Sequence, residues 1–364
     1  MAPFPATVHP YPSAKPDAST TYAYEYSPSP SPARNALIFI GGLGDGPHGV
    51  PYLRAIHSKL VATEGLDFTV FEIRLTSAYS AFGYGSLARD VADIAALVRY
   101  LRETLGKDKI VLMGHSTGCQ DCMEYADYEK YGNPRVDGYI LQGPVSDREA
   151  LGMTTDKEEL GRSVAYAEEL VKSGKGEEVV PREMLPDGWR EAPVSAYRWW
   201  SLAGVGGDDD YFSSDLPDER VAAIWGRIEQ PVLIVPSGAE EYTPASIDVA
   251  KLVNRWKSFC KPQVASELSG LIPGANHRVD NDEGQKWLAG RVSAKKAWRG
   301  CGSHIPTVFA NVPEDQWCTC EPKTEVNGKK YPPMAKLNVG LPSWMTSWMG
   351  GGSSNKTSED TAQK

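Results

Sequence analysis

The sequence lacks any long apolar segment. Across its 364 residues, no run approaches the roughly 18 to 20 consecutive apolar residues that a membrane-spanning helix needs. Residues 1–16, MAPFPATVHPYPSAKP, are interrupted by prolines where a signal peptide would have its apolar centre. We therefore expect a cytosolic protein that does not bind membranes.

Cysteines are few, and basic residues are outnumbered by acidic ones. Because we expect a cytosolic protein, we expect its six cysteines to be reduced thiols. Cys318 and Cys320 lack the two further ligands of a zinc site, so we expect no metal and no cofactor. The net charge of −9, without a basic block, argues against nucleic acid or an anionic membrane as partner. A small molecule remains the favoured partner, and the sequence does not indicate an oligomeric state.

The chain does contain a strand, a tight turn and a helix start in succession. Ile110–Met113 is a short apolar run typical of a strand buried on both faces. It leads into Gly114-His115-Ser116-Thr117-Gly118, which fits the G-x-S-x-G nucleophile elbow. In such an elbow, glycines two residues before and after the serine allow strained backbone angles that lift its hydroxyl above the sheet. Ser116 is therefore the predicted nucleophile.

An earlier apolar run, residues 36–40, ends in the glycine-rich loop Gly41–Gly46. The loop matches neither G-x-x-x-x-G-K-[ST] nor G-x-G-x-x-G, so a phosphate-binding role is disfavoured. Backbone N–H groups can turn inward at such glycines and bind an oxyanion. By position, the N–H groups of Leu43 and Thr117 are the predicted oxyanion donors.

Strand and helix patterns alternate along the rest of the core. This alternation predicts an α/β fold with a mostly parallel central sheet flanked by helices. Residues 1–34 are rich in Pro and Ser, with one possible edge strand at Thr21–Tyr26. The predicted core covers residues 35–144 and 229–298. Within it we expect helices at 51–63, 86–105 and 282–298, the second of them N-capped by Ser86. We expect further strands at 68–74, 136–141, 231–235 and 268–272.

Residues 145–228 interrupt the alternation and predict a cap between the sixth and seventh strands. Charged helical stretches such as 156–172 make this cap polar. Trp199, Trp200 and Tyr211 could contact substrate, although adjacent tryptophans more often anchor a cap to its core. Arg74, at the end of a core strand, could bind a substrate anion or form a structural ion pair.

The other two members of a catalytic triad are expected after late strands. His277 lies in a loop downstream of both the serine and the acid, the chain order of α/β-hydrolases. Glu240, four residues before Pro244, is the first candidate for the acid that orients the histidine. Glu241 and Asp147 are the alternatives. Beyond the core, we expect a C-terminal extension at 299–349 and a disordered tail at 350–364.

Taken together, several of these motifs resemble a largely fungal α/β-hydrolase family long described as of unknown function. The resemblance covers residues 35–298 and rests on Gly41–Gly46, 74–86, the GHSTG elbow with Cys119-Gln120-Asp121, 209–216 and 238–244. The family's characterised member is an intracellular ester hydrolase of fusarinine-type siderophores. The resemblance implies Ser116 and His277 as catalytic residues and a hydroxamate siderophore ester as substrate. Where the family has Asp-Glu-Tyr, this chain has Glu240-Glu241-Tyr242, which leaves the acid less secure.

The function expected from the sequence is therefore serine-dependent hydrolysis of carboxylic esters, with siderophore esters as the implied substrate. A general carboxylesterase, lipase or acyltransferase would use the same triad. A non-catalytic binding protein of the same fold is the alternative from another functional class, because fold alone does not fix function.

Overall fold

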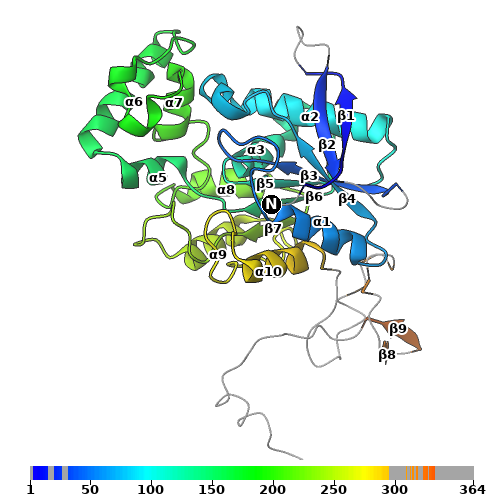
Figure 1. Ribbon diagram of the computed structural model, residues 1–364. Coiled ribbons are helices and arrows are strands. Elements are labelled where there is room, and N and C mark those ends of the chain that lie inside the picture. Colours follow the sequence, from blue (N-terminus) through cyan, green and yellow to red (C-terminus); the bar gives the residue numbers. More distant parts are fainter. Residues whose placement is uncertain are drawn as a thin grey trace, which may run out of the picture. The chain divides into compact units, whose positions relative to one another are not determined.

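The computed structural model describes residues 3–14, 20–26 and 32–294, and within the C-terminal part residues 309, 312, 314, 317–318, 323–326 and 328–332. The chain divides into two compact units, 1–294 and 295–364. In the first unit, a central sheet lies between two groups of helices (Figure 1). No helix among the described residues is long and apolar enough to cross a membrane.

The sheet has seven strands in the order β1-β2-β4-β3-β5-β6-β7. From β4 through β7, neighbouring strands run parallel, as predicted, because each crossover is long enough to contain a helix. The strands of this parallel part are almost entirely buried. They are β3 (Asn35–Ile40), β4 (Phe68–Ile73), β5 (Ile110–His115), β6 (Gly138–Gln142) and β7 (Val232–Val235).

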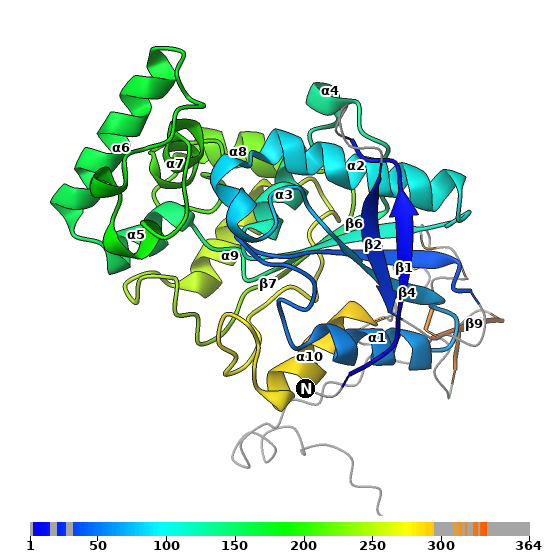
Figure 2. The ribbon, with the colours of Figure 1, turned by 45° about the horizontal axis from the view of Figure 1, so that its top comes forward.

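The N-terminal segment contributes two strands to the same sheet, where the sequence predicted one edge strand. β1 (Ala6–Tyr11) pairs antiparallel with β2 (Thr21–Tyr26), and β2 pairs antiparallel with β4 (Figure 2). β2 therefore lies inside the sheet, and β1 forms its edge. Pro10 is tolerated in β1 because an edge strand can spare a backbone donor.

Helices cover both faces of the sheet. Leu53 and Ile56 of α1, together with α10, pack on one face, and the apolar stripe of α2 packs with α3 on the other. Ser86 caps α2 by accepting a hydrogen bond from the Arg89 N–H, as predicted. These helices are α1 (Leu53–Ala62), α2 (Leu87–Glu103), α3 (Gly118–Tyr125), α9 (Val249–Phe259) and α10 (Asp282–Val292), with the short α4 (Tyr128–Tyr131) and the 3-10 helix η1 (Tyr79–Tyr84).

The prediction of a strand at 268–272 is wrong. Residues 265–272 contact β7 and its continuation only through isolated bridges at Ala265, before the predicted strand, and at Ile272, its last residue. Between them, the Ile234 N–H donates to the side chain of Ser269 (3.0 Å), so a hydroxyl replaces a backbone carbonyl. A continuous ladder of backbone hydrogen bonds cannot form where a side chain accepts from a backbone N–H group of the neighbouring strand.

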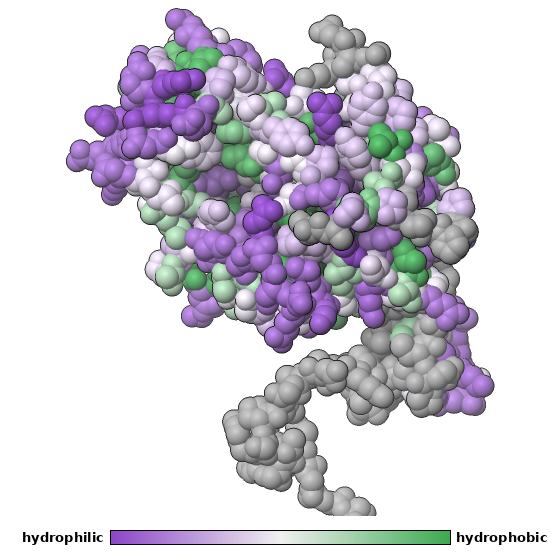
Figure 3. Space-filling model, viewed as in Figure 1, coloured by the Kyte–Doolittle hydropathy of each residue, from purple (hydrophilic) through white to green (hydrophobic). Residues whose placement is uncertain are grey.

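Residues between β6 and β7 form six helical elements, and the first five of them enclose a compact apolar cluster of their own. Trp199 is fully buried in this cluster, with Val180, Leu185 and Val194 around it. Hydrophilic residues cover its outer surface over α6 (Figure 3). α5 (Asp147–Thr154), α6 (Lys157–Lys172), the 3-10 helices η2 (Arg182–Met184) and η3 (Asp187–Trp189), and α7 (Ala196–Ala203) make up this region. α8 (Asp218–Gly226) instead joins the core, where Trp225 stacks on Trp256 of α9.

In the second unit, β8 (Thr324–Val326) and β9 (Lys329–Tyr331) form a hairpin. Tyr331 packs with Phe309 and Trp317 in a small apolar cluster. Cys318 is disulfide-bonded, which corrects the expectation that all six cysteines are reduced. Cys119, Cys122 and Cys260 are free thiols. Cys301, Cys320, the end of the helix predicted at 282–298 and the predicted tail at 350–364 lie outside the described residues.

Candidate active site

Ser116 lies on a strained turn between β5 and α3. Its φ of 54° is in the left-handed region, which non-glycine residues rarely adopt. Two close approaches explain the glycines of the motif. A Cβ at Gly114 would lie 2.2 Å from the Gly118 carbonyl oxygen, and one at Gly118 would lie 2.4 Å from that of Ile40. The G-x-S-x-G spacing is therefore a steric requirement of this turn, and strain of this kind is typical of functional sites.

The glycine-rich loop after β3 packs against the same turn. A Cβ at Gly42 would lie 2.9 Å from the Cβ of Ser116. The Asp45 side chain shapes the loop by accepting a hydrogen bond from the Gly42 N–H (2.9 Å). Leu43 and Thr117 both line the cavity above Ser116, and no hydrogen bond of their N–H groups to another described residue is found. These N–H groups are thus free to bind a ligand oxygen.

His277 contacts both glutamates of the late loop through different atoms. Its Nδ1 lies 2.9 Å from Glu240 Oε2, and both side chains are nearly sealed from solvent, at 7% and 3% exposure. Its backbone N–H donates to Glu241 Oε2 (2.8 Å). Because Nδ1 is engaged by Glu240, Nε2 is the ring nitrogen left for a proton from a nucleophile. Asp147 lies on another part of the cavity wall.

His115 and Gln142 form a buried network beneath the site. The Gln142 side chain accepts hydrogen bonds from His115 Nδ1 (2.6 Å) and the Tyr52 hydroxyl (2.8 Å), and its amide donates to the His277 carbonyl (3.3 Å). Its backbone carbonyl accepts from the Ser116 N–H (3.1 Å). Burial, with the neighbouring His277, lowers the pKa of His115 to about 3. His115 is therefore neutral and serves as a support for the site.

Ser116 and His277 line one cavity of about 360 Å³, a size suited to a small molecule. Leu151 from α5 and Trp189 from η3 form part of its wall, so the segment between β6 and β7 helps to enclose the nucleophile. Polar and apolar side chains are mixed around the cavity. The remaining wall includes Asp45, Val145, Asp147, Ala150, Thr154, Tyr242 and Arg278.

The residues predicted to bind substrate lie elsewhere. Trp199 is buried in the α5–α7 cluster, where its indole N–H donates to Ser163 (3.0 Å), and the neighbouring Trp200 packs against the same cluster. Tyr211 is buried and accepts a hydrogen bond from Arg227 (3.0 Å). Arg74 is exposed beside the outer side of the glycine-rich loop. None of the four lines the cavity of Ser116.

Trp189, Tyr242 and Arg278 were missed by sequence reasoning. The Tyr242 ring contacts the His277 ring edge-on, with centroids 4.8 Å apart. Tyr242 and Arg278 directly neighbour candidate triad residues, a signal that was available in the sequence. Trp189 gave no such signal, because it lies in a turn-rich stretch far from every motif. Among the described residues, no group of three or more His, Cys, Asp or Glu side chains could hold a metal ion.

Comparisons with known proteins identify the family of the chain. A family described as "Protein of unknown function (DUF1749)" matches residues 1–295, and a "Domain of unknown function (DUF8730)" matches residues 290–328. The "UPF0613 protein PB24D3.06c" of Schizosaccharomyces pombe is 36% identical over 276 residues, 71% of this chain and 86% of that protein. The "Fusarinine C esterase sidJ" of Aspergillus fumigatus is 31% identical over 300 residues, 68% of this chain and 84% of that protein.

Solved structures give the same answer at the level of the fold. The siderophore hydrolase EstB of Aspergillus fumigatus is 28% identical, has a TM-score of 0.66 and covers 80% of this chain and 96% of its own. An α/β-hydrolase fold protein at 16% identity and a TM-score of 0.54 supports the fold alone. The α/β-hydrolase fold and the family resemblance predicted from the sequence are both confirmed. The chain belongs to the family described as proteins of unknown function DUF1749.

Proposed function

We propose that the protein is a serine ester hydrolase with Ser116 as nucleophile, His277 as general base and Glu240 as the orienting acid. The single observation that carries this proposal is the juxtaposition of a strained, cavity-lining serine with a histidine whose Nδ1 is held by a buried glutamate. Relatives named as esterases in the same family support ester hydrolysis as the reaction class.

In the proposed mechanism, His277 Nε2 takes the proton of Ser116 as the hydroxyl attacks the ester carbonyl. Glu240 stabilises the imidazolium that forms. The N–H groups of Leu43 and Thr117 bind the oxyanion, a contribution whose loss typically costs about a hundredfold or more in turnover. The alcohol leaves with the proton from His277, and water then hydrolyses the acyl-enzyme with His277 again as base.

For the substrate, we propose ester bonds of fusarinine-type hydroxamate siderophores, cleaved to release iron. The names of the fusarinine C esterase and the siderophore hydrolase among the relatives support this assignment. The moderate size and mixed polarity of the cavity fit a polar small molecule better than a long acyl chain. A lipase would require a wide apolar cavity, whereas the wall of this cavity includes the charged residues Asp45, Asp147 and Arg278.

The proposal is tested by hydrolysis of a ferric fusarinine-type triester by the purified full chain, followed by mass spectrometry of the linear products and the monomer. Ser116→Ala is the matched variant, because it removes only the hydroxyl. Conversion by wild type and not by the variant supports both the nucleophile and the substrate class.

Two other outcomes separate the alternatives. If wild type cleaves a simple aryl ester but not the triester, the substrate assignment is wrong and a general carboxylesterase remains. If wild type cleaves neither, a binding protein of this fold replaces the enzyme.

We also infer a cytosolic location from the free thiols of Cys119, Cys122 and Cys260, the state favoured in a reducing compartment. The disulfide of Cys318 favours an oxidising compartment instead. Imaging of the tagged full chain in its host distinguishes a cytosolic from a secretory location. A diffuse cytosolic signal supports the inference, and a signal in secretory compartments contradicts it.

A further inference from the structure

Asp147 is a residue of the candidate active-site cavity that the proposed triad does not use. It is the first residue of α5, it is half-buried, and it lines the same cavity as Ser116 and His277. The histidine takes its acidic contacts from Glu240 and Glu241 instead. A carboxyl group in the cavity without a role in the triad is available for contact with the substrate.

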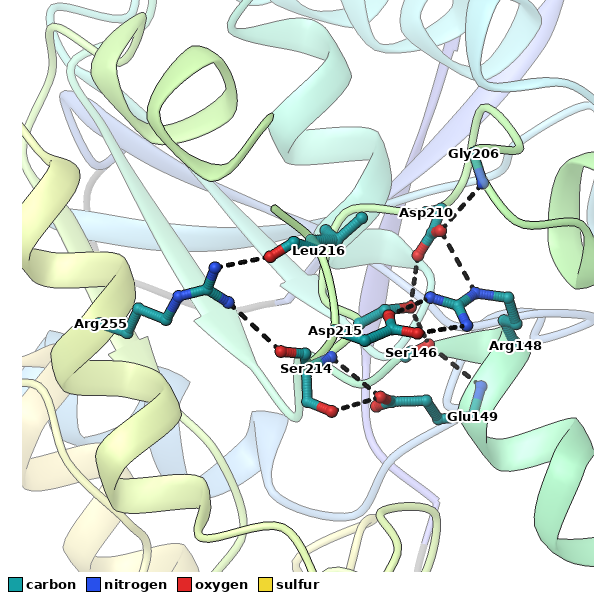
Figure 4. Close-up of polar contacts among 10 residues, drawn as sticks. Ser146, Arg148, Glu149, Gly206, Asp210, Ser214, Asp215, Leu216 and Arg255 are labelled. Atoms are coloured by element: carbon teal, nitrogen blue, oxygen red, sulfur yellow. Dashed lines mark hydrogen bonds and ion pairs between the residues drawn. The ribbon is translucent and has the colours of Figure 1, made fainter. Parts of the chain in front are cut away.

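The residues on both sides of Asp147 are fixed by polar contacts (Figure 4). Ser146 caps α5 by accepting from the Glu149 N–H (3.1 Å), and its hydroxyl lies 2.6 Å from that of Ser213. The first turn of α5 is thereby anchored to the loop that follows α7, which limits where the Asp147 side chain can lie. Further contacts of this turn join Arg148 to Asp210 (3.3 Å) and to Asp215, and Glu149 to the N–H of Ser214 (2.9 Å).

One oxygen of Asp147 is engaged and the other is not. Gln120 Nε2, from α3, donates to Asp147 Oδ2 (2.7 Å). The same nitrogen lies 3.4 Å from the Val145 carbonyl oxygen, which fixes the orientation of the amide. Oδ1 has no hydrogen-bond partner among the described residues. It is also not one of their side-chain atoms that are both unpaired and sealed from solvent, so it stays accessible. Because Asp147 lines the cavity and its Oδ2 is engaged by Gln120, Oδ1 is the carboxyl oxygen left for a ligand in the cavity.

The surroundings of Asp147 favour its neutral form. Burial, together with the carboxylates of Asp209 and Asp210, raises the pKa of Asp147 to about 8, although Arg198 and the hydrogen bond from Gln120 oppose this rise. Because Oδ2 accepts from Gln120, the proton belongs on Oδ1. The other charged or titratable groups around it are Cys119 on α3, Arg148 on α5 itself, and His115, His277, Asp45 and Arg278 on the cavity wall.

We propose that Asp147 is a specificity-determining residue that donates a hydrogen bond from Oδ1–H to an acceptor oxygen of the substrate near the scissile ester. This inference rests on the proposed function and adds to it a preference among ester substrates. Esters that carry an amide, hydroxamate or hydroxyl oxygen close to the scissile bond are preferred to plain alkyl esters, because a bound plain ester shields the Oδ1–H donor from water without offering it an acceptor. No proton is transferred in this role.

The test compares three 4-nitrophenyl or alkyl esters of matched length: a plain ester, one with an amide oxygen in the acyl part, and one with it in the alcohol part. The measured quantity is the ratio of kcat/KM for each amide-bearing ester to that of the plain ester, from pH 6 to 9. The variants are Asp147→Ala, which removes the donor, and Asp147→Asn, which keeps an N–H donor. Asp208→Asn, an exposed acid outside the cavity, is the control.

We expect wild type and Asp208→Asn to prefer one amide-bearing ester by about tenfold, the usual effect of one hydrogen bond. Asp147→Ala loses this preference, and Asp147→Asn keeps most of it. In wild type the preference declines as the pH rises through about 8, when Asp147 ionises, and in Asp147→Asn it does not.

A wild type without preference, or an Asp147→Ala variant that keeps it, overturns the inference and leaves the esterase intact. If Asp147→Ala fails to fold, the Asn variant decides: the same decline above pH 8 in that variant excludes Asp147 as the donor. A wild type that hydrolyses none of the three esters overturns the proposed function, and this inference with it.

Discussion

At the scale of single residues, the candidate site depends on two adjacent glutamates that contact the same histidine in different ways. Glu240 binds the imidazole Nδ1, whereas Glu241 binds the backbone N–H of His277. The sequence alone could not choose between them, since both lie after the same strand and both are chemically able. The structure distinguishes them because only a carboxylate at Nδ1 can select the tautomer and stabilise an imidazolium.

The two glutamates should therefore differ sharply under conservative substitution. Glu240→Gln is expected to lower kcat by about a thousandfold or more, because an amide at Nδ1 favours the wrong tautomer. Glu241→Gln should lower it by less than about tenfold, because the exposed side chain still offers an oxygen to the backbone N–H. Steady-state kinetics on an aryl ester measure both, and the reverse order of effects would identify Glu241 as the acid.

At the scale of elements, the pattern of apolar residues predicted two kinds of element correctly. These are helices, whose hydrogen bonds are local, and strands that are buried on both faces. β5 and α2 are examples, with a continuous apolar run and a regular apolar stripe. The segment 268–272 looked like a strand because it is apolar, but the side chain of Ser269 competes for the ladder. The position of Trp189 depends on how the α5–α7 region folds over the core, a contact between distant segments that no local pattern encodes.

A buried cation, Arg198, is part of the contact between α7 and the core. Arg198 of α7 lies 2.7 Å from Asp209, with side-chain exposures of 3% and 0%. Asp90 on α2 and Asp121 on α3 also lie near it, and burial raises the pKa of Asp90 to about 7 and that of Asp121 well above its ordinary value. Several carboxyl groups thus share a single guanidinium group.

Arg198→Met should lower the free energy of unfolding at pH 7 by about 3–5 kcal/mol, because it leaves buried carboxylates without a counter-charge. Arg135→Met is the control, since the Arg135–Glu229 pair is exposed and should contribute at most about 1 kcal/mol. Denaturant unfolding measures both. Equal small losses would show that the buried acids are already neutral without Arg198, whereas partial recovery on adding Asp209→Asn would support its role as counter-charge.

At the scale of the whole molecule, stability should depend on pH through acids that are buried without full pairing. Glu72, near the end of β4, is the clearest case: it is 2% exposed, and its sealed Oε2 accepts no hydrogen bond and lies 3.8 Å from the partly exposed His48 Nε2. Burial raises its pKa from about 4.5 to about 7, with a further contribution from Asp45, while hydrogen bonds from His48 and Tyr26 oppose the rise. The folded state therefore holds a proton that the unfolded chain releases.

The sign of the effect follows from this difference. Between pH 4.5 and 7 the folded state binds more protons at Glu72 than the unfolded state, so its contribution to stability falls as the pH rises. Glu72→Gln stays neutral and should become more stable relative to wild type from pH 5 to pH 8, by up to about 3 kcal/mol. Denaturant unfolding across this range, with the exposed Glu64→Gln as control, tests it. A constant difference between Glu72→Gln and wild type would mean that Glu72 is ionised in the folded protein.

The central claim is that Ser116 is an activated nucleophile, and covalent trapping tests it most directly. The full chain is treated with a fluorophosphonate, and intact-mass spectrometry with peptide mapping measures the extent and position of the label. We predict a single adduct on Ser116 in wild type and none in Ser116→Ala. We also predict labelling slowed by a hundredfold or more in His277→Ala, which loses the base. An unlabelled wild type, or a label that persists in Ser116→Ala, would contradict the account.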